Sequence, residues 1–179
     1  MADRLSIGAA APDFSLKGVD GKTHRLADYA DFPVLVVMFT CNHCPYVQAY
    51  EDRLIALQAD YEAKGARFVA INANETANHP EDSFDKMVER ARRLGFNFPY
   101  LRDEDQSVAT AYGAACTPEV FVFDRERRLR YTGRIDDNHR DASKVTKREL
   151  RDALDALLAG KAPPAAETHP IGCSIKWST

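Results

Sequence analysis

The chain has 179 residues, of which 45% are hydrophobic and 28% charged, and its formal net charge is −3. This length is enough for one hydrophobic core and too short for two ordinary domains. The small negative charge argues against binding to nucleic acid or to an anionic membrane surface. No apolar run is long enough to span a bilayer, so we expect no membrane insertion.

The first residues give an expectation about where the protein works. Residues 1–6 lack the apolar core of a secretory signal peptide, so a chain that starts at Met1 is expected to be cytoplasmic. Four cysteines in a chain that is not exported favour reducible, working thiols over a scaffold of structural disulfides.

The N-terminal half predicts a hairpin, a central strand and a long helix. A turn signal at residues 19–23 separates extended segments at 14–16 and 23–26, which indicates a small hairpin. Residues 34–39 are apolar and β-branched, as in a strand buried on both faces. Apolar side chains then recur at alternating spacings of three and four over residues 47–61, which predicts an amphipathic helix.

The C-terminal half continues this alternation of strands and helices. The order of elements predicts an α/β fold, with a mixed central sheet flanked by helices on both faces and preceded by the N-terminal hairpin. We expect a strand at 67–72, a helix from 78 to 94, an extended piece at 98–101, a short helix at 105–112, paired strands at 120–123 and 129–133, and a last helix at 146–158.

The end of the chain differs in character from the rest. We expect residues 1–160 to form a single domain and residues 161–179 to form a C-terminal tail. The tail contains Ile171, Ile175 and Trp177, and leaving such side chains exposed costs roughly 1.5–3 kcal/mol each. The tail is therefore predicted to pack back on the domain.

A Cys-x-x-Cys pair stands between the central strand and the long helix. Cys41 is expected near the helix N-terminus, where free N–H groups and the helix dipole stabilise a thiolate and lower its pKa. Cys44 lies one turn further on, close enough to close a small disulfide ring and so to carry two electrons. Two alternatives remain open, a pair of buried structural thiols and half of a zinc site. The remaining cysteines, Cys116 and Cys173, stand alone, and the chain has no His-x-x-x-His pair to complete a zinc site.

Three blocks in order carry a family resemblance, and together they span roughly residues 6–136. They are residues 8–16 with the turn at 20–22, residues 39–45 around the cysteine pair, and residues 112–121 around Thr117-Pro118 with Gly133-Arg134 beyond. With these blocks the chain resembles the thioredoxin superfamily, in the redoxin branch that includes peroxiredoxins and the cytochrome-maturation thioredoxins. The resemblance implies a thioredoxin-like fold.

The same resemblance implies a site around a cis proline. Thr117-Pro118 is expected to be a cis peptide bond that faces the cysteine pair. In the family, the backbone before this proline pairs with extended substrate beside the reactive sulfur. Cys116 precedes the proline by two residues and is expected near the rim of the site. Together with Cys173 of the tail, Cys116 is a candidate for a second disulfide or an electron relay.

The expected function is that of a thiol–disulfide oxidoreductase. Cys41, taken to lie nearer the helix start and the surface, is the expected nucleophile, and Cys44 is the resolving thiol. No cofactor and no metal is expected. The implied partners are protein or small-molecule disulfides and dithiols and an upstream thiol reductant. Their identity, the direction of electron flow and the oligomeric state stay open.

Two further side chains are assigned supporting roles. His43 lies between the cysteines, as a histidine does in the bacterial periplasmic disulfide oxidases, which implies a thiolate stabilised by imidazole and a more oxidising couple. Relatives carry an acid at the positions that here hold Leu35 or Val47. Glu119, directly after Pro118, is therefore the nearest candidate to accept the Cys44 proton. The alternatives are a solvent-exposed His43 and a solvated Glu119.

Three other functions are weighed against this one. A peroxiredoxin-like thiol peroxidase, with antioxidant activity, is disfavoured because Thr40 does not fit the Pro-x-x-x-Thr-x-x-Cys motif. A thioredoxin-fold copper chaperone would use both cysteines and His139, but such chaperones have three residues between their cysteines and this chain has two. A pure interaction protein with inert cysteines is the third.

Overall fold

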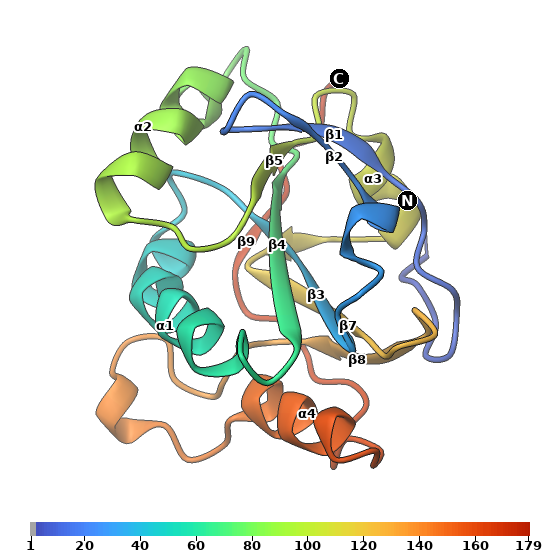
Figure 1. The fold of residues 1–179 in the computed structure, drawn as a ribbon. Helices are drawn as coiled ribbons and strands as arrows, with labels where there is room; N and C mark the ends of the chain where they lie inside the picture. Colours follow the sequence, from blue (N-terminus) through green and yellow to red (C-terminus); the bar gives the residue numbers. More distant parts are fainter. Residues whose placement is uncertain (1–2) are drawn as a thin grey trace.

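The structure is a computed structural model that describes residues 3–179. Strands and helices alternate along most of the chain (Figure 1). In chain order the elements are β1 (Ser15–Gly18), β2 (Thr23–Arg25), η1 (Leu26–Tyr29), β3 (Val34–Thr40), α1 (Pro45–Tyr61), β4 (Ala66–Asn72), η2 (Pro80–Asp82), α2 (Phe84–Leu94), β5 (Tyr100–Arg102), α3 (Ser107–Tyr112), β6 (Cys116–Thr117), β7 (Glu119–Phe123), β8 (Leu129–Gly133), η3 (Ala142–Lys144), α4 (Glu149–Leu158) and β9 (Cys173–Ser174).

A seven-stranded sheet forms the centre of the molecule, with the strand order β2-β1-β5-β4-β3-β7-β8. β4 runs parallel to both β3 and β5, whereas the pairs β3–β7, β7–β8, β1–β5 and β1–β2 are antiparallel. The predicted mixed sheet and the N-terminal hairpin are therefore confirmed. A second, two-stranded sheet, which the sequence analysis did not predict, pairs β6 with β9 near the C-terminus.

The strand β3 is buried on both faces, as predicted, and it divides the core in two. All of its residues are buried. Val36 and Met38 belong to the cluster that includes side chains of α1, α2 and α4, whereas Val37 and Phe39 belong to the cluster that includes side chains of η1 and α3. In Figure 1, α1 and α2 lie on one side of the sheet and α3 on the other. The end of β3 is thus held from both sides.

The predicted helix at 78–94 is broken in the structure. Residues Pro80–Asp82 form the short helix η2, and α2 begins at Phe84 after Ser83, whose side chain accepts a hydrogen bond from the backbone N–H of Lys86. Because the chain turns at this cap, Asp82 is 0% exposed. The break therefore places a carboxylate inside the molecule, where a continuous surface helix would have left it in solvent.

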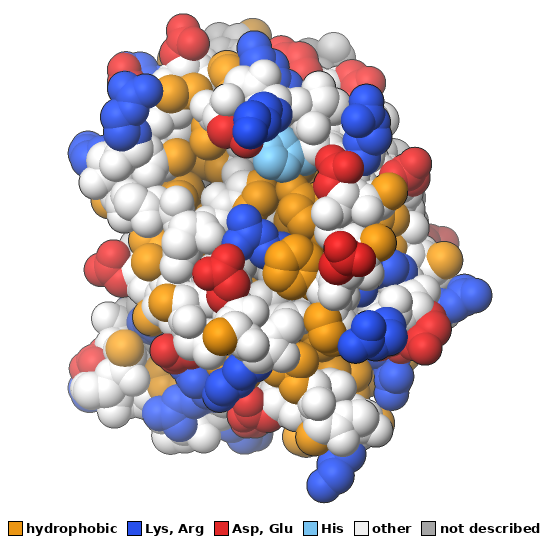
Figure 2. Space-filling view, viewed as in Figure 1, with side chains coloured by type: hydrophobic (Ala, Val, Ile, Leu, Met, Phe, Trp, Pro, Cys, Tyr) orange, Lys and Arg blue, Asp and Glu red, His pale blue; other side chains and the backbone are white. Residues whose placement is uncertain are grey.

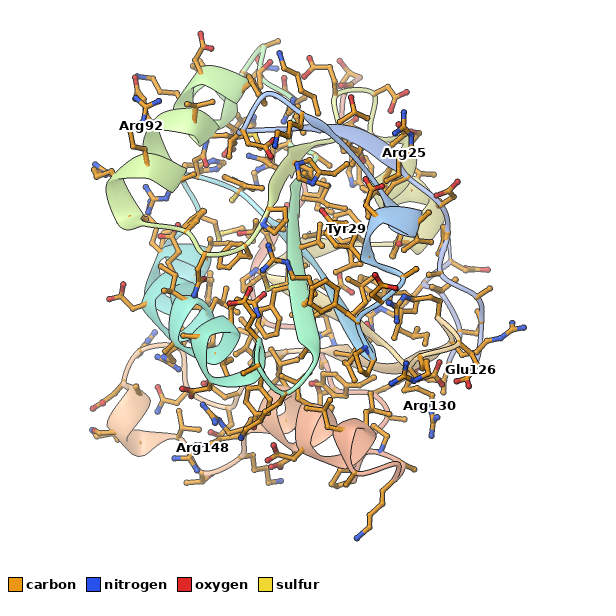
Figure 3. All side chains as sticks on the ribbon, viewed as in Figure 1. Arg25, Tyr29, Arg92, Glu126, Arg130 and Arg148 are labelled. Carbon is orange, nitrogen blue, oxygen red and sulfur yellow. The ribbon has the colours of Figure 1, made fainter. Side chains whose placement is uncertain are left out.

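The surface carries charges of both signs. Figure 2 shows Lys and Arg side chains interspersed with Asp and Glu over the face that it draws, as the small net charge suggests. In the basic run of α2, Arg92 projects outward (Figure 3), while the Nε of Arg90 donates a hydrogen bond to Glu51 over 2.7 Å. Within residues 3–179, no helix has the length and apolar character needed to cross a membrane.

The last residues of the tail reach the body of the protein. Ile175 is 3% exposed, and its backbone N–H donates to the carbonyl of Ala115 over 3.0 Å. Ile171 and Trp177 remain 39% and 42% exposed. The apolar contact expected of the tail is therefore made by Ile175, and the expectation that Ile171 and Trp177 share it is wrong.

Candidate active site

Two cysteines lie where the central strand gives way to the first long helix. Cys41 directly follows β3, and Cys44 is the N-cap residue of α1. Pro45 is the first residue of the helix, a position at which the missing N–H of proline costs nothing. Cys41 is 1% exposed and Cys44 0%. The expectation that Cys41 lies nearer the helix start and the surface is therefore wrong, because Cys44 caps the helix and both side chains are buried.

The surroundings of the two sulfurs favour a thiolate on Cys44. A hydrogen bond from the Cys41 thiol is the largest cause that lowers the pKa of Cys44 to about 4, and Cys173 and the backbone N–H of Val47 act in the same direction. The same hydrogen bond raises the pKa of Cys41, as do burial and the nearby carboxylate of Asp82. The structure therefore reverses the expected assignment, in which Cys41 is the thiol of low pKa.

The loop before Pro118 lies against both sulfurs. The Thr117–Pro118 peptide bond is cis. Thr117 Oγ1 lies 3.5 Å from Cys41 Sγ, and the carbonyl oxygen of Thr117 lies 3.5 Å from Cys44 Sγ. Strand β7 begins directly after Pro118 and pairs with β3, which fixes the loop beside the end of the central strand. The cysteine pair and the proline loop thus meet, although they are far apart in the sequence.

The carboxylate of Glu119 is bound by Arg4 and by backbone N–H groups of the loop before Pro118. Its side chain is 0% exposed, and one carboxylate oxygen lies 2.8 Å from a guanidinium nitrogen of Arg4. The other oxygen accepts hydrogen bonds from the backbone N–H groups of Ala115 and Cys116, over 2.9 and 3.2 Å. These contacts hold the loop that leads to the proline. They favour a structural role for Glu119 over the expected role as acceptor of the Cys44 proton.

A buried carboxylate and a histidine flank the cysteine pair on the side of η2. Nδ1 of His43 forms a short hydrogen bond with Asp82. Asp82 also accepts from the backbone N–H of Asn42 over 2.6 Å and from the side chain of Asn74 over 3.0 Å. The His43 ring stacks on His79, with ring centroids 5.5 Å apart. His43 is therefore held in place by Asp82, and the alternative of a free, solvent-exposed histidine does not describe it.

Asp82 was not singled out from the sequence, where it is one of several acids in the helix expected from 78 to 94. A signal was present at the carboxyl end of β4, where Asn72 and Asn74 follow an apolar run. Both are buried, and both donate side-chain hydrogen bonds to Asp82, because buried polar groups require partners. Leu35 and Val47 are buried and apolar. The buried carboxylate beside the site therefore comes from Asp82, and neither Leu35 nor Val47 supplies one.

One group of side chains in the site has the composition of a metal site. Ligand atoms of Cys41, His43 and Asp82 lie within 4.8 Å of one another. Among the described residues 3–179, no other three side chains of these types come this close together. His139, which the copper alternative requires, is outside the group. Its ring packs on Tyr46, with centroids 4.5 Å apart. The ligand set of a copper chaperone is therefore not assembled.

The two lone cysteines have different surroundings. Cys173 Sγ lies 2.7 Å from Cys44 Sγ. Cys116 Sγ lies 4.0 Å from a carboxylate oxygen of Glu119, and burial raises the pKa of the Cys116 thiol to about 12. Of the two, Cys173 is the one that the fold brings into contact with the Cys-x-x-Cys pair.

Comparisons with known proteins bear on the family and the fold of the chain. The sequence matches the AhpC/TSA family over residues 7–132. It is similar to the thiol-disulfide oxidoreductase ResA of Geobacillus thermodenitrificans, with 29% identity over 128 residues, or 70% of this chain and 68% of that protein. Among solved structures, a hypothetical protein from Sinorhizobium meliloti is 41% identical, with a TM-score of 0.93 over 99% of this chain and 98% of that one.

A more distant structure bears on the fold alone. A peroxidoxin from Mycobacterium tuberculosis is 20% identical, with a TM-score of 0.60 over 87% of this chain and 96% of that one. This likeness confirms the thioredoxin-like fold that the sequence predicts. The chain therefore belongs to the AhpC/TSA family, and it is a redoxin of the thioredoxin superfamily.

Proposed function

We propose that this oxidoreductase exchanges disulfides with protein or small-molecule thiols through Cys41 and Cys44. The observation that carries the proposal is geometric. Thr117, which precedes the cis bond, lies 3.5 Å from Cys41 Sγ through its Oγ1 and 3.5 Å from Cys44 Sγ through its carbonyl oxygen. A thiolate is the reactive form of cysteine, and the lowered pKa of Cys44 supports the same proposal because it gives the pair one negative charge at neutral pH.

Disulfide reduction by the pair proceeds in two exchanges. In the first, the proton of Cys41 passes to Cys44 along their hydrogen bond, and the Cys41 thiolate attacks one sulfur of the substrate disulfide. A mixed disulfide forms, and the other substrate sulfur leaves as a thiolate. In the second, that leaving thiolate takes the proton from Cys44, which attacks Cys41 Sγ and releases the remaining substrate sulfur. The pair is oxidised by two electrons and the substrate is reduced by two.

His43 and Asp82 assist in handling the charge of the first exchange. His43 Nδ1 is hydrogen-bonded to Asp82, so the imidazole has a fixed orientation beside Cys41. A protonated imidazole in this place stabilises a thiolate on Cys41, while the Asp82 carboxylate alone opposes it. The balance between the His43 imidazole and the Asp82 carboxylate therefore determines whether Cys41 or Cys44 carries the negative charge.

The partners follow from the chemistry of the site. A thiol–disulfide oxidoreductase needs a disulfide or dithiol substrate and, for turnover as a reductase, an upstream thiol donor. A location in the cytoplasm, where such donors are present, is part of the proposal and is tested by cell fractionation. The similarity to ResA supports the class of reaction and leaves the substrate open.

Reduction of a disulfide-linked peptide, with dithiothreitol as electron donor, tests the proposal. Cys41→Ser and Cys44→Ser should each reduce the rate to that of the uncatalysed reaction, and Cys44→Ser should accumulate a mixed disulfide with the peptide on Cys41. Cys116→Ser is the matched control and should keep the wild-type rate. Wild-type turnover in both Cys41→Ser and Cys44→Ser would overturn the proposal. Hydrogen peroxide consumption that survives Cys44→Ser would support the peroxidase alternative in its place.

A further inference from the structure

We propose that Cys173 is a third redox thiol of this site, which forms a disulfide with Cys44, and that the strand carrying Cys173 acts as a built-in substrate strand beside the proline loop. The inference rests on the proposed function, since it assigns a further step to the same dithiol. It goes beyond that function because it makes the C-terminal tail part of the reaction cycle.

The first observation is the separation of the sulfurs. Cys173 Sγ lies 2.7 Å from Cys44 Sγ, which is closer than two non-bonded sulfur atoms normally approach and longer than the about 2.05 Å of a disulfide bond. Cys173 also packs against the small apolar cluster of Cys41, Cys44 and Val47. The two sulfurs are therefore positioned to form a bond.

The second observation is the pairing of the tail with the proline loop. β9 runs antiparallel to β6, with Cys173 opposite Thr117 and Ser174 opposite Cys116. Thr117 directly precedes the cis bond to Pro118. This is the backbone with which, as the family resemblance implies, an extended substrate pairs. The tail thus takes the place of a substrate strand and presents a cysteine to the dithiol.

A glycine allows the tail to come this close. A Cβ atom added at Gly172 would lie 2.0 Å from the carbonyl oxygen of Thr117 and 2.6 Å from its carbonyl carbon. Real Cβ atoms do not approach backbone atoms to that extent, so a larger residue here would separate the strands. The absence of a side chain at residue 172 is therefore what permits the contact between Cys173 and the site.

The tail is held just beyond this contact and is not a loose end. The carbonyl oxygen of Lys176 accepts hydrogen bonds from Gln106 and from the backbone N–H of Glu75, each over 2.8 Å. The backbone N–H of Lys176 donates to Asn74 over 2.9 Å. These partners lie on the loop after β4 and just before α3. The position of Cys173 is therefore set by the fold, since the segment just beyond it is tied to two other parts of the chain.

The proposed step is an internal disulfide exchange. Once substrate reduction has left a disulfide between Cys41 and Cys44, the Cys173 thiolate attacks Cys44 Sγ. The bond between Cys41 and Cys44 breaks, the bond between Cys44 and Cys173 forms, and Cys41 leaves as a thiolate that takes the proton lost by Cys173. The step moves no electrons into or out of the protein and needs no added reactant. It returns Cys41 to the reduced state and moves the oxidised pair to the tail.

The protonation of Cys173 agrees with this order of events. Burial, and next the hydrogen bond to Cys44, raise the pKa of the Cys173 thiol to about 11 in the reduced protein. When Cys44 is part of a disulfide its negative charge is gone, so this second cause disappears and Cys173 ionises more readily. Oxidation of the pair therefore raises the thiolate fraction of Cys173.

Peptide mapping of the oxidised full-length protein tests the inference. The protein is oxidised with glutathione disulfide, quenched in acid, alkylated and digested with trypsin, which places Cys41 and Cys44 on the peptide 26–53 and Cys173 on the peptide 162–176. In the wild type and in the control Cys116→Ser, the major product should be these two peptides joined through Cys44 and Cys173. In Cys173→Ser the cross-link should be lost and the disulfide between Cys41 and Cys44 should remain.

Other outcomes separate this inference from the function on which it rests. An oxidised wild type that holds only the disulfide between Cys41 and Cys44, with Cys173 alkylated, overturns the inference and leaves the proposed function standing. A cross-link from Cys173 to the peptide 103–125, which contains Cys116, overturns it as well. If neither the wild type nor Cys173→Ser forms a disulfide at the pair, the proposed function itself fails.

Discussion

Replacing Gly172 by alanine should open the active site without unfolding the protein. The added Cβ would lie 2.0 Å from the carbonyl oxygen of Thr117, an atom of the backbone next to the cis bond that cannot move aside. The strand β9 must separate from β6, and Ile175, which is 3% exposed, loses its burial. Burial of an isoleucine side chain stabilises by about 1.5–3 kcal/mol, and each 1.4 kcal/mol is a factor of about ten in an equilibrium. The open fraction should therefore rise roughly ten- to a hundredfold.

The rate at which iodoacetamide alkylates Cys44 in the reduced protein measures this opening. Cys44 is 0% exposed in the closed arrangement, so its alkylation requires the tail to leave. The rate should rise by the same factor in Gly172→Ala, while circular dichroism should show unchanged helix and strand content. Ser174→Ala, an exposed position on the same strand, is the control and should react like the wild type. Alkylation of Gly172→Ala at the wild-type rate would refute the reasoning that the tail covers Cys44.

Three further predictions concern charge in the site. Because the pKa of Cys44 is lowered to about 4, thiolate absorbance in the reduced protein should persist at neutral pH, disappear near pH 4, and be missing at neutral pH in Cys44→Ser. The same lowered pKa contributes stability that is complete above the ordinary thiol pKa of about 9 and is lost as the pH falls towards 4. In urea titrations, the free energy of unfolding of the reduced wild type should therefore rise relative to that of Cys44→Ser as the pH rises across this window. An equal pH dependence of the two free energies would contradict the low pKa of Cys44. Since Asp82 raises the pKa of Cys41, Asp82→Asn should move the alkylation of Cys41 to lower pH, and a move to higher pH would count against this role.

Much of the fold could be predicted because its signals are local. The apolar run at 34–39 has no polar face, and a strand of that kind must be covered on both sides. The alternating spacing over 47–61 predicts the buried face of α1, and Val47, Tyr50 and Leu54 are buried there. The turn at 19–23 separates β1 from β2 as expected. Each of these features depends on residues that are neighbours in the chain.

The parts that could not be predicted depend on contacts between distant residues. Asp82 resembles the other acids near α2 in the sequence, and only the turn at Ser83 and the asparagines at the end of β4 reveal that it is buried. The low pKa of Cys44 depends first on the hydrogen bond from its neighbour Cys41, but also on Cys173, which is 129 residues away along the chain. The two-residue strand β9 has no periodicity to detect. The meeting of Cys41 and Cys44 beside the proline loop was therefore predictable, and the distribution of charge between them was not.

The reduction potential of the Cys41–Cys44 couple tests the central claim most directly. The protein is equilibrated with glutathione buffers, and its thiols are trapped and counted by mass spectrometry, in the wild type, Cys173→Ser and Cys44→Ser. The proposed function predicts a two-electron couple between roughly −280 and −120 mV in Cys173→Ser, the range of working thiol–disulfide oxidoreductases, and none between these two residues in Cys44→Ser. A Cys173→Ser protein in which Cys41 and Cys44 stay reduced across all buffers would contradict it.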